Sequence, residues 1–338
     1  MNLIQLPDRI ALSEPIEFPQ IEPISEGIHR PFWSVMIPTY NRTKLLVEAL
    51  ESVLAQDLGP DEMQIEVVDN CSPDVDVEAL VKEVGKGRVS FYRRPFNAGQ
   101  VGNWNTCINR ARGHWIHILH DDDIVLPGFY SRLRSSLEKE PSVGAALCRY
   151  IYMDEEGHWQ YLSELEMRTP GILSDWLERL GPGVIQCPAV VVKRSTYEKL
   201  GGFSLQLEYM FDMEMWMRIA VHYPFWYEPK PLACYRSLTS ISGTSALFKS
   251  DVPVTSSYRL LVILQSYIPE KIAAKLIQIH TEKLRIFSIV VIRHNISQGN
   301  FTISLNQIKT LLKCDPSFRI IKGIVGSFIW GVKKSFTN

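Results

Sequence analysis

The amino-acid sequence predicts an α/β fold, in which a mostly parallel sheet is flanked by helices and followed by a helical C-terminal region. Between residues 33 and 153, short apolar runs typical of strands alternate with stretches of helical periodicity. This alternation predicts parallel β-α-β units with right-handed crossovers. Small polar clusters also follow the ends of several expected strands, and open parallel sheets bind ligands at those ends. The pattern therefore predicts both the fold class and the edge of the sheet that carries the function.

The expected elements follow one another regularly in the first half of the chain. The first strand, WSVMIP, ends at Pro38, and the helix after it places Leu46, Leu50 and Leu54 on one face. The third helix is expected to end at Gly113. We expect strands at residues 33–38, 64–70, 88–94, 114–120 and 143–153, and helices at residues 44–56, 75–84, 99–113 and 126–140.

The rest of the chain is less regular. A helix is expected at residues 171–181, a strand, a helix and a turn at residues 185–203, and a further helix within residues 208–224. Residues 252–338 have mostly helical periodicity. Residues 1–31 are rich in Pro and Glu and have no clear period, which predicts an extended leader, either draped on the body or partly disordered.

The charge of the chain is balanced overall and uneven along its length. The 338 residues carry a formal net charge of −1, which argues against a nucleic-acid-binding protein. Residues 251–338 hold 12 Lys and Arg against 4 Asp and Glu, a net charge of +8, and the preceding 250 residues carry −9. This asymmetry indicates an acidic catalytic body joined to a basic surface or tail.

The cysteines and the N-terminus predict a cytoplasmic protein. Six cysteines are widely scattered without a CxxC pair, so neither a structural zinc site nor a redox motif is indicated. A reduced chain is the simpler interpretation. The N-terminus lacks the basic start and apolar stretch of a signal peptide, and no apolar run approaches the ~20 residues of a membrane span.

Three consecutive aspartates, Asp121, Asp122 and Asp123, follow the apolar run of the fourth expected strand. Neighbouring carboxylates repel one another, and acidic residues are rarely buried without a partner. A solvated acidic turn is one explanation. A divalent cation is the other, because hard cations prefer carboxylate oxygens. For an isolated DDD the acidic turn would be the preferred explanation, and the rest of the sequence has to decide between the two.

Six segments in a fixed order resemble family 2 glycosyltransferases, whose Rossmann-like nucleotide-sugar fold is called GT-A. These segments are SVMIPTYNR, VVDNCSPD, FNAGQVGNWNTCINRARGHWI, LHDDDIVLPGF, PAVVVKRSTYEKLGGF and FDMEMWMR, which lie between Ser34 and Arg218. The resemblance as a whole covers about residues 33–236, roughly two thirds of the chain. The resemblance implies a nucleoside-diphosphate sugar donor, Mn²⁺ or Mg²⁺ as cofactor, and inversion at the anomeric carbon. A non-catalytic sugar-nucleotide-binding or scaffold protein and a nucleotidyltransferase are the alternatives. PTYNRTK lacks the glycine-rich loop expected of a nucleotidyltransferase.

The resemblance assigns roles to the polar clusters at the strand ends. It places Asp122 at the metal-binding position, with Asp123 as a further participant. It places a set of residues against the nucleotide, where Tyr40 stacks on the base and Gly99 allows close backbone approach. Helix caps and turns are the competing explanations for this set. Arg93 and Arg94 could pair with phosphate, and a surface salt bridge is the competing explanation for them. Its members are Thr39, Tyr40, Asn41, Asp69, Asn70, Asn97, Gly99, Asn103 and Asp121.

Asp212, in FDMEMWMR, matches the acidic residue that this family uses as catalytic base. Inverting transfer needs one carboxylate near the acceptor hydroxyl to take its proton. Glu214 and Glu208 are the alternative bases, and the competing role for Asp212 is a helix N-cap. Three positions depart from the family pattern: His120 stands where many relatives have an aspartate, Asn70 replaces a second aspartate, and Leu238 lies where many relatives have a histidine shortly after the Tyr-Arg pair. These departures leave the metal ligands and the base of the donor undetermined.

The resemblance also divides the chain. We expect an N-terminal leader at 1–31, a nucleotide-sugar-binding half at 32–150, an acceptor-side half at 151–250 and a basic helical region at 251–338. The expected acceptor is a saccharide or a lipid-linked saccharide of bacterial surface polysaccharide assembly. The segment RIIKGIVGSFIWGVKK, residues 319–334, has an apolar stripe with lysines beside it. It either packs on the body or lies at the inner face of the plasma membrane.

Overall fold

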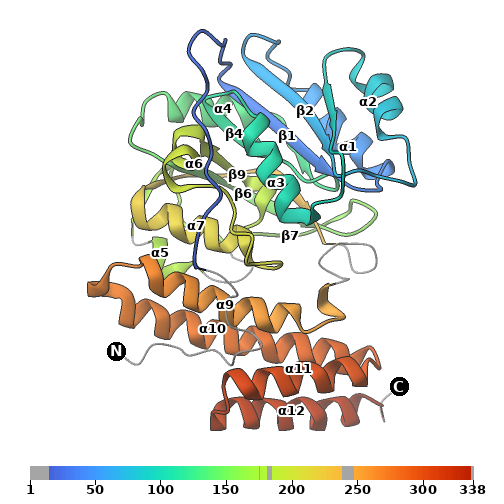
Figure 1. Cartoon of the computed structure of the whole chain (residues 1–338), viewed down its shortest axis with the longest axis vertical. Coiled ribbons are helices and arrows are strands. Elements are labelled where there is room, and N and C mark those ends of the chain that lie inside the picture. The colour runs from blue at the N-terminus through green and yellow to red at the C-terminus, as the bar shows by residue number, and fades with distance from the viewer. Residues whose placement is uncertain (1–14, 175, 181–184, 238–246, 336–338) are drawn as a thin grey trace.

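The computed structural model describes residues 15–174, 176–180, 185–237 and 247–335, with side chains to residue 327. It shows a mixed ten-stranded sheet with the order β3-β2-β1-β4-β9-β6-β10-β5, in which β7 pairs with β6 and β8 pairs with β10. Helices cover both faces of this sheet, and four further helices form a block below it in the view of Figure 1. The α/β class and the helical C-terminal region are therefore confirmed.

The strands are β1 (Trp33–Thr39), β2 (Met63–Asp69), β3 (Ser90–Arg93), β4 (Trp115–Ile118), β5 (Ile124–Val125), β6 (Ala145–Met153), β7 (Trp159–Leu162), β8 (Gly171–Leu173), β9 (Val190–Lys193) and β10 (Phe225–Arg236). The helices are α1 (Lys44–Leu54), α2 (Val77–Gly85), α3 (Gly99–Arg110), α4 (Phe129–Leu137), α5 (Trp176–Arg179), α6 (Arg194–Leu200), α7 (Phe211–His222), α9 (Val252–Tyr267), α10 (Glu270–Ser297), α11 (Phe301–Cys314) and α12 (Phe318–Ser335). A short 3₁₀ helix spans Cys187–Ala189.

Alternation along the buried strands builds a core on each face of the sheet. Val35 and Ile37 of β1 pack into the core that α1, α2 and α4 cover. Met36, between them, points to the opposite core, which α3, α6 and α7 cover. Successive side chains of a strand point to opposite faces, so an apolar run without alternation is buried on both sides. This explains why WSVMIP, with no polar interruption after Ser34, forms a central strand.

The sheet departs from the expected parallel order at its centre. Strands β3, β2, β1 and β4 are parallel neighbours, as the β-α-β pattern predicts. Strand β9 then enters antiparallel to both β4 and β6, so β4 and β6 do not pair directly. The three valines of its run VVVK are buried, and the run lies far from both partners in the sequence. Periodicity reports burial but not strand direction, so local sequence could not predict this insertion.

The longest strand, β10, was not expected, and the helix expected at 171–181 was partly wrong. Strand β10 contains EPKPL, and its pairing with β6 shifts register around Pro231 because proline cannot donate to a ladder. Because prolines are uncommon in strands, the two prolines made β10 look like a loop in the sequence. Within 171–181, the structure forms strand β8 followed by α5. Strand β8 pairs with β10, which is distant in the sequence, so this pairing could not be predicted from the local sequence of residues 171–181.

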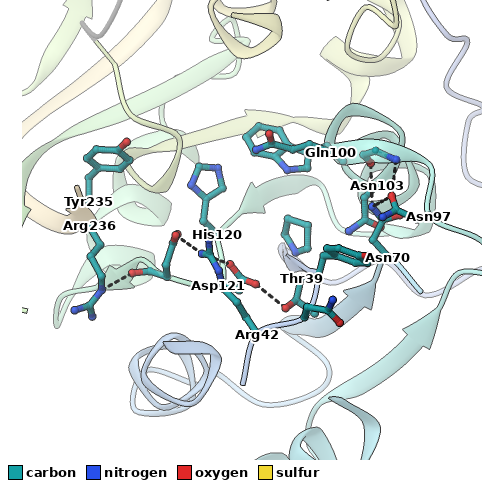
Figure 2. Close-up of a pocket in the computed structure, with 16 residues that line it drawn as sticks. Thr39, Arg42, Asn70, Asn97, Gln100, Asn103, His120, Asp121, Tyr235 and Arg236 are labelled. Carbon is teal, nitrogen blue, oxygen red and sulfur yellow. Dashed lines mark hydrogen bonds and ion pairs between the residues drawn. The ribbon is translucent and has the colours of Figure 1, made fainter. Parts of the chain in front are cut away.

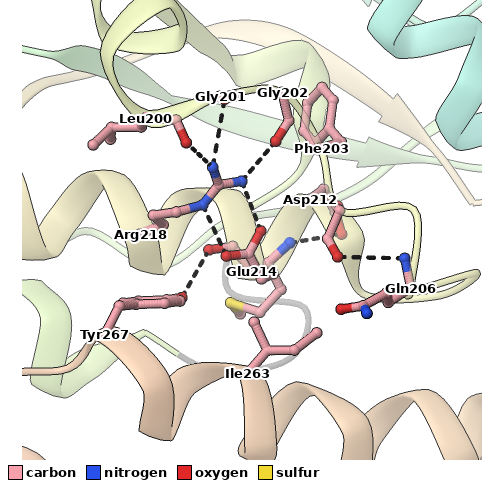
Figure 3. A network of polar contacts seen from close by, with 12 residues as sticks. Leu200, Gly201, Gly202, Phe203, Gln206, Asp212, Glu214, Arg218, Ile263 and Tyr267 are labelled. Carbon is pink, nitrogen blue, oxygen red and sulfur yellow. Dashed lines mark hydrogen bonds and ion pairs between the residues drawn. The ribbon is translucent and has the colours of Figure 1, made fainter. Parts of the chain in front are cut away.

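A buried ion pair joins helix α7 to its surroundings (Figure 3). Arg218 donates to both carboxylate oxygens of Glu214 at 2.9 Å, and to the backbone carbonyl of Gly202 at 2.8 Å. Helix α9 contributes Tyr267, whose hydroxyl donates to the backbone carbonyl of Glu214 at 3.4 Å. Phe18, from the leader, stacks under the Arg218 guanidinium at 3.6 Å. The network thus ties the start of α7 to the turn before it, to the C-terminal helices and to the described part of the leader.

Candidate functional site

A pocket lies beyond the carboxyl ends of β1, β2 and β4. It has a volume of about 530 Å³, which is within the usual range for small-molecule sites. Figure 2 shows its side chains converging from the loops after these strands, from the start of α3 and from the end of β10. Its lining residues are Pro38, Thr39, Tyr40, Asn41, Arg42, Asn70, Asn97, Gly99, Gln100, Asn103, Trp104, His120, Asp121, Asp122, Tyr235 and Arg236.

The loop after β1 faces the acidic residues across this pocket. Thr39, at the end of β1, donates from Oγ1 to Asp121 Oδ2 at 2.6 Å. Arg42 donates from Nη1 to Asp121 Oδ1 at 3.0 Å and also contacts the carboxylate of Asp122. Tyr40 is 43% exposed on the rim, where an aromatic face is open to a ligand. The parallel pairing of β1 with β4 brings these two loops together.

The opposite wall is held together by amide hydrogen bonds. Asn70 donates to Asn97 Oδ1 at 2.9 Å and to the carbonyl of Gly99 at 3.1 Å, and its own Oδ1 accepts from the Ala98 amide at 3.1 Å. Asn70 therefore braces the loop that enters α3. Asn103 donates to the Val68 carbonyl at 3.0 Å, whereas its buried Oδ1 has no hydrogen-bond partner among the described residues. That oxygen is an acceptor available to a ligand.

Asp69, Arg93 at the end of β3 and Arg94 after it take part in structural contacts beside the pocket. Asp69 is fully buried, does not line the cavity, accepts from the backbone and hydroxyl of Ser72, and pairs with Arg93 Nε at 2.8 Å. Arg94 donates to the Gly102 carbonyl at 3.2 Å and contacts the Thr106 hydroxyl. Arg93 therefore forms an ion pair with a protein carboxylate, whereas the contacts of Arg94 are to a carbonyl and a hydroxyl.

The three aspartates occupy three different environments. Asp121 and Asp122 line the pocket, whereas Asp123 is 0% exposed behind it. Asp123 Oδ1 accepts the backbone N–H of Arg236 at 2.7 Å, and its other oxygen lies 2.9 Å from His120 Nδ1. Arg236 also donates from Nε to the Asp122 carbonyl at 2.9 Å. The end of β10 thus fixes the acidic loop in place.

The charged groups of the acidic loop change one another's pKa values. Burial, together with the neighbouring Asp122 charge, raises the pKa of Asp121 to about 6, although Arg42 and Thr39 oppose the rise. Burial likewise raises the pKa of Asp123 to about 6 against its hydrogen bond with His120. Burial lowers the pKa of His120, but hydrogen bonds to Asp123 and Cys187 outweigh burial and leave it well above its usual value. A cation in the pocket would relieve this crowding of negative charge.

The donor set at the acidic loop is compatible with Mn²⁺ or Mg²⁺. Ligand atoms of His120, Asp122 and Asp123 lie within 4.8 Å of one another. Carboxylate oxygens suit both ions, and an imidazole nitrogen is acceptable to manganese. Asp122 is the member whose carboxylate faces the pocket together with Asp121. His120, which stands where many relatives have an aspartate, therefore lies within the candidate ligand group.

A second, smaller cavity of about 140 Å³ adjoins the first and contains Asp212. Gln100, Trp104, His120 and Tyr235 line both cavities, so the two meet along these four side chains. The second cavity is also lined by Ile185, Gln186, Glu208, Tyr209, Met210, Phe211, Met213 and Leu247. The candidate base therefore lies next to the pocket that holds the acidic loop.

Asp212 is half-buried in the first turn of α7, which begins at Phe211. The N-cap is Met210, in the left-handed region at φ 63°, so Asp212 is not the cap. Asp212 Oδ1 accepts the Met213 amide at 2.8 Å, and burial raises the pKa of Asp212 above its ordinary value. Glu208 also lines this cavity, whereas Glu214 does not and is paired with Arg218. The geometry thus favours Asp212 over Glu214.

Sequence reasoning missed several residues that line the two cavities. Arg42 and Gln100 lie next to predicted residues in the quoted motifs, so their position was the available signal. Trp104 follows Asn103 in α3 and stacks near His120, with ring centroids 4.9 Å apart. Gln186 lies at the start of the segment 185–203, for which a strand, a helix and a turn were expected but no role in the site. Leu238, at a position that departs from the family pattern, lies outside the described residues.

Two known proteins match this chain in sequence over different lengths. A protein of Mycobacterium tuberculosis of unknown activity is 28% identical over 250 residues, covering 70% of this chain and 77% of the relative. The succinoglycan biosynthesis protein ExoO of Rhizobium meliloti is 36% identical over 117 residues, covering 35% of this chain and 32% of ExoO. The chain thus spans about a third of ExoO.

Two solved structures share the fold. Staphylococcus aureus TarS, residues 1–349, in complex with UDP-GlcNAc, has a TM-score of 0.64 at 17% identity and covers 86% of this chain and 81% of that one. The mannosyltransferase PcManGT from Pyrobaculum calidifontis, in complex with GDP-Man and Mn²⁺, has a TM-score of 0.55 at 16% identity, covering 96% and 85%. At these identities the structures support the fold alone.

The sequence profile described as "Glycosyl transferase family 2" matches residues 34–201. The match begins in β1 and ends at the turn after α6, so it contains the loop after β1, the start of α3 and the acidic loop after β4. Together with the shared fold, it establishes that this chain belongs to glycosyl transferase family 2.

Proposed function

We propose that this family 2 enzyme is a metal-dependent, inverting glycosyltransferase that moves a sugar from a nucleoside-diphosphate sugar to a hydroxyl acceptor. The observation that carries the proposal is the meeting of two cavities. The pocket with the acidic loop adjoins the cavity with Asp212, and His120, Trp104 and Tyr235 line both. A donor in the first cavity would present its anomeric carbon towards the second.

In this proposal the residues of the first cavity bind the donor. Tyr40 offers its exposed ring to the base, and the Asn103 Oδ1 acceptor faces the nucleotide. Asp122, with His120 and Asp123, would hold Mn²⁺ or Mg²⁺. When bound, this ion neutralises charge on the leaving diphosphate. PcManGT, which shares the fold, was solved with GDP-Man and Mn²⁺.

Asp212 performs the proton transfer in the proposed reaction. The acceptor hydroxyl oxygen forms a bond to the anomeric carbon while the bond from that carbon to the diphosphate oxygen breaks, and the hydroxyl proton passes to Asp212. One displacement inverts the anomeric configuration and needs no covalent enzyme intermediate. We infer that residues 151–250, which carry Asp212 and Glu208, form the acceptor side.

The metal role of Asp122 is tested by thermal unfolding with UDP and with GDP, each with and without Mn²⁺. A ligand at a hundredfold excess over Kd stabilises the native state by about 2.7 kcal/mol. We expect Mn²⁺ to increase the stabilisation by at least one nucleotide, and Asp122→Asn or EDTA to abolish this increase. Asp154→Asn is the control, since Asp154 belongs to a separate group with Glu156 and His158. An unchanged Mn²⁺ response in Asp122→Asn would contradict the assignment.

We further propose that the acceptor is lipid-linked and that α12 lies on an anionic membrane at the cytoplasmic face. Helix α12 has two apolar faces. Ile320 and Ile324 are buried, whereas Phe318, Ile321 and Val325 are 78%, 45% and 51% exposed. Residues 251–338 carry a net charge of +8, which complements anionic lipids. Among the described residues, none of the helices combines the length and apolar character needed to cross a bilayer.

A vesicle sedimentation assay tests the membrane proposal. We expect the chain to bind vesicles containing phosphatidylglycerol, and to bind neutral phosphatidylcholine vesicles far less. The double variant Ile321→Ser/Val325→Ser should weaken binding by about tenfold, because two exposed apolar side chains are lost. Leu58→Ser, an exposed residue between α1 and β2, is the matched control. Equal binding by both variants would refute the assignment of α12. The side chains of residues 328–334 lie outside the described part of this helix.

A further inference from the structure

Arg42 places a positive charge directly beside Asp121 and Asp122. It extends from the loop after β1 to the acidic loop after β4, and its side chain is 20% exposed. Nη1 lies 3.0 Å from Asp121 Oδ1 and also contacts Asp122 Oδ2. One guanidinium nitrogen therefore bridges two neighbouring carboxylates that would otherwise repel each other. An arginine guanidinium stays charged at any ordinary pH, so both contacts are ion pairs.

This contact competes with a metal ion. Asp122 is the pocket-facing carboxylate of the candidate metal group, and its Oδ2 is the atom that Arg42 contacts. A divalent cation needs that carboxylate at a bond length of about 2.0–2.6 Å. A cation at this distance and the guanidinium repel each other, and they share the same acceptor. Arg42 must therefore leave Asp122 when the ion enters.

The donor supplies a new partner for the displaced guanidinium. In the proposed reaction, the diphosphate arrives with the metal ion and adds negative charge beside Asp121 and Asp122. Arginine pairs well with phosphate because its planar fork can donate two hydrogen bonds. Arg42 lines the same pocket as the residues proposed to bind the donor. A short movement of its side chain would exchange a carboxylate partner for a phosphate partner.

We propose that Arg42 is a built-in cation that holds the metal-binding carboxylates and exchanges them for the donor diphosphate when the metal–nucleotide complex binds. The inference rests on the proposed function and extends it to the order of binding. The metal alone must displace Arg42 without compensation, whereas the metal with a nucleotide offers it a phosphate. Metal and nucleotide therefore bind cooperatively, and by linkage each raises the affinity for the other by the same factor.

The test measures Mn²⁺ binding directly, through the electron paramagnetic resonance signal of free Mn²⁺, with and without UDP or GDP. Without nucleotide, Arg42→Gln should bind Mn²⁺ about tenfold more tightly than the wild type, because its uncharged amide does not repel the ion. With nucleotide and Mn²⁺ together, the same variant should bind the nucleotide about tenfold more weakly. Because Arg42→Gln should bind the nucleotide alone as the wild type does, linkage requires the cooperativity between metal and nucleotide to shrink about tenfold.

Two control variants distinguish competition from a general disturbance of the loop. Arg42→Lys keeps the charge and should retain weak Mn²⁺ binding in the absence of nucleotide. Asp122→Asn should lose Mn²⁺ binding whichever residue stands at position 42. If Mn²⁺ binds the wild type and Arg42→Gln equally without nucleotide, the exchange is refuted and the proposed function stands. If Mn²⁺ binds none of these proteins, with or without UDP or GDP, the metal-dependent function fails as well.

Discussion

Asp212→Asn is expected to lower kcat by about 10²- to 10⁴-fold, the usual contribution of a general base, while the free energy of unfolding changes little. The amide keeps the size of the side chain and can still accept the Met213 N–H at the start of α7. It cannot take a proton from an acceptor hydroxyl. The loss should therefore fall on turnover, with donor binding preserved, because Asp212 lies in the cavity beside the donor pocket.

The measurement is sugar transfer from a radiolabelled donor, together with nucleotide binding by the same variant. Glu208→Gln is the matched control, since Glu208 is a second carboxylate of that cavity. A large loss in Glu208→Gln with Asp212→Asn nearly normal would move the base to Glu208. If the wild-type protein binds the nucleotide but transfers sugar to no acceptor, the result supports the alternative of a non-catalytic sugar-nucleotide-binding protein.

The pH dependence of the reaction provides a second readout of Asp212. Burial raises its pKa above the ordinary value of 3.8. The base must be ionised, so activity should rise with pH through this raised pKa and fall as pH drops below it. The acidic limb of kcat should therefore lie above pH 3.8 in the wild type. The residual activity of Asp212→Asn should lack that limb.

Arg218→Met is expected to have the largest effect on stability, a loss of about 3–5 kcal/mol in the free energy of unfolding. Arg218 and Glu214 are both almost fully buried, and two hydrogen bonds of 2.9 Å join them. Removing the guanidinium leaves Glu214 without its charge partner and deprives the Gly202 carbonyl of its donor. Burial already raises the pKa of Glu214 despite Arg218, so an uncompensated carboxylate there is costly.

Urea unfolding of Arg218→Met, of Glu214→Leu and of the double variant that combines them measures this loss of stability. In Glu214→Leu/Arg218→Met the buried charge is removed together with its partner, so much of the lost stability should return. Arg134→Met is the surface control: Arg134 pairs with the partly exposed Glu62 and Glu138, and its loss should cost less than about 1 kcal/mol. A loss below 1 kcal/mol in Arg218→Met would mean that the ion pair does not hold the start of α7.

The structure confirms the alternation of strands and helices over residues 33–153. The prediction worked because β1 and β2 are buried on both faces and the helices between the parallel strands have a single apolar stripe each. Boundaries were less accurate: the helix expected to end at Gly113 ends at Arg110. The failures were β10, whose prolines resemble loop sequence, and β8, which was taken as helix. Both strands depend on pairing with distant partners, which local periodicity does not contain.

The candidate site, like the fold, could be predicted from the sequence only in part. Its first cavity collects Thr39, Asn70, Asn97, Asp121 and Asp122, because the ends of parallel strands lie at one edge of the sheet. The types and order of these residues were visible in the sequence. Their division of labour was not, because side chains next to one another along the chain can face in different directions.

The sequence by itself determined the α/β class, the family resemblance and the segments that form the site, since these depend on local periodicity and motif order. Only the tertiary structure decided which carboxylates face the cavities. Asp122 lines the donor pocket while Asp123, its neighbour, is buried against Arg236. Asp212 lines the adjoining cavity, and Glu214, two residues later, is paired with Arg218. The role of a carboxylate depends on its burial and on distant partners, and folding alone brings those partners within reach.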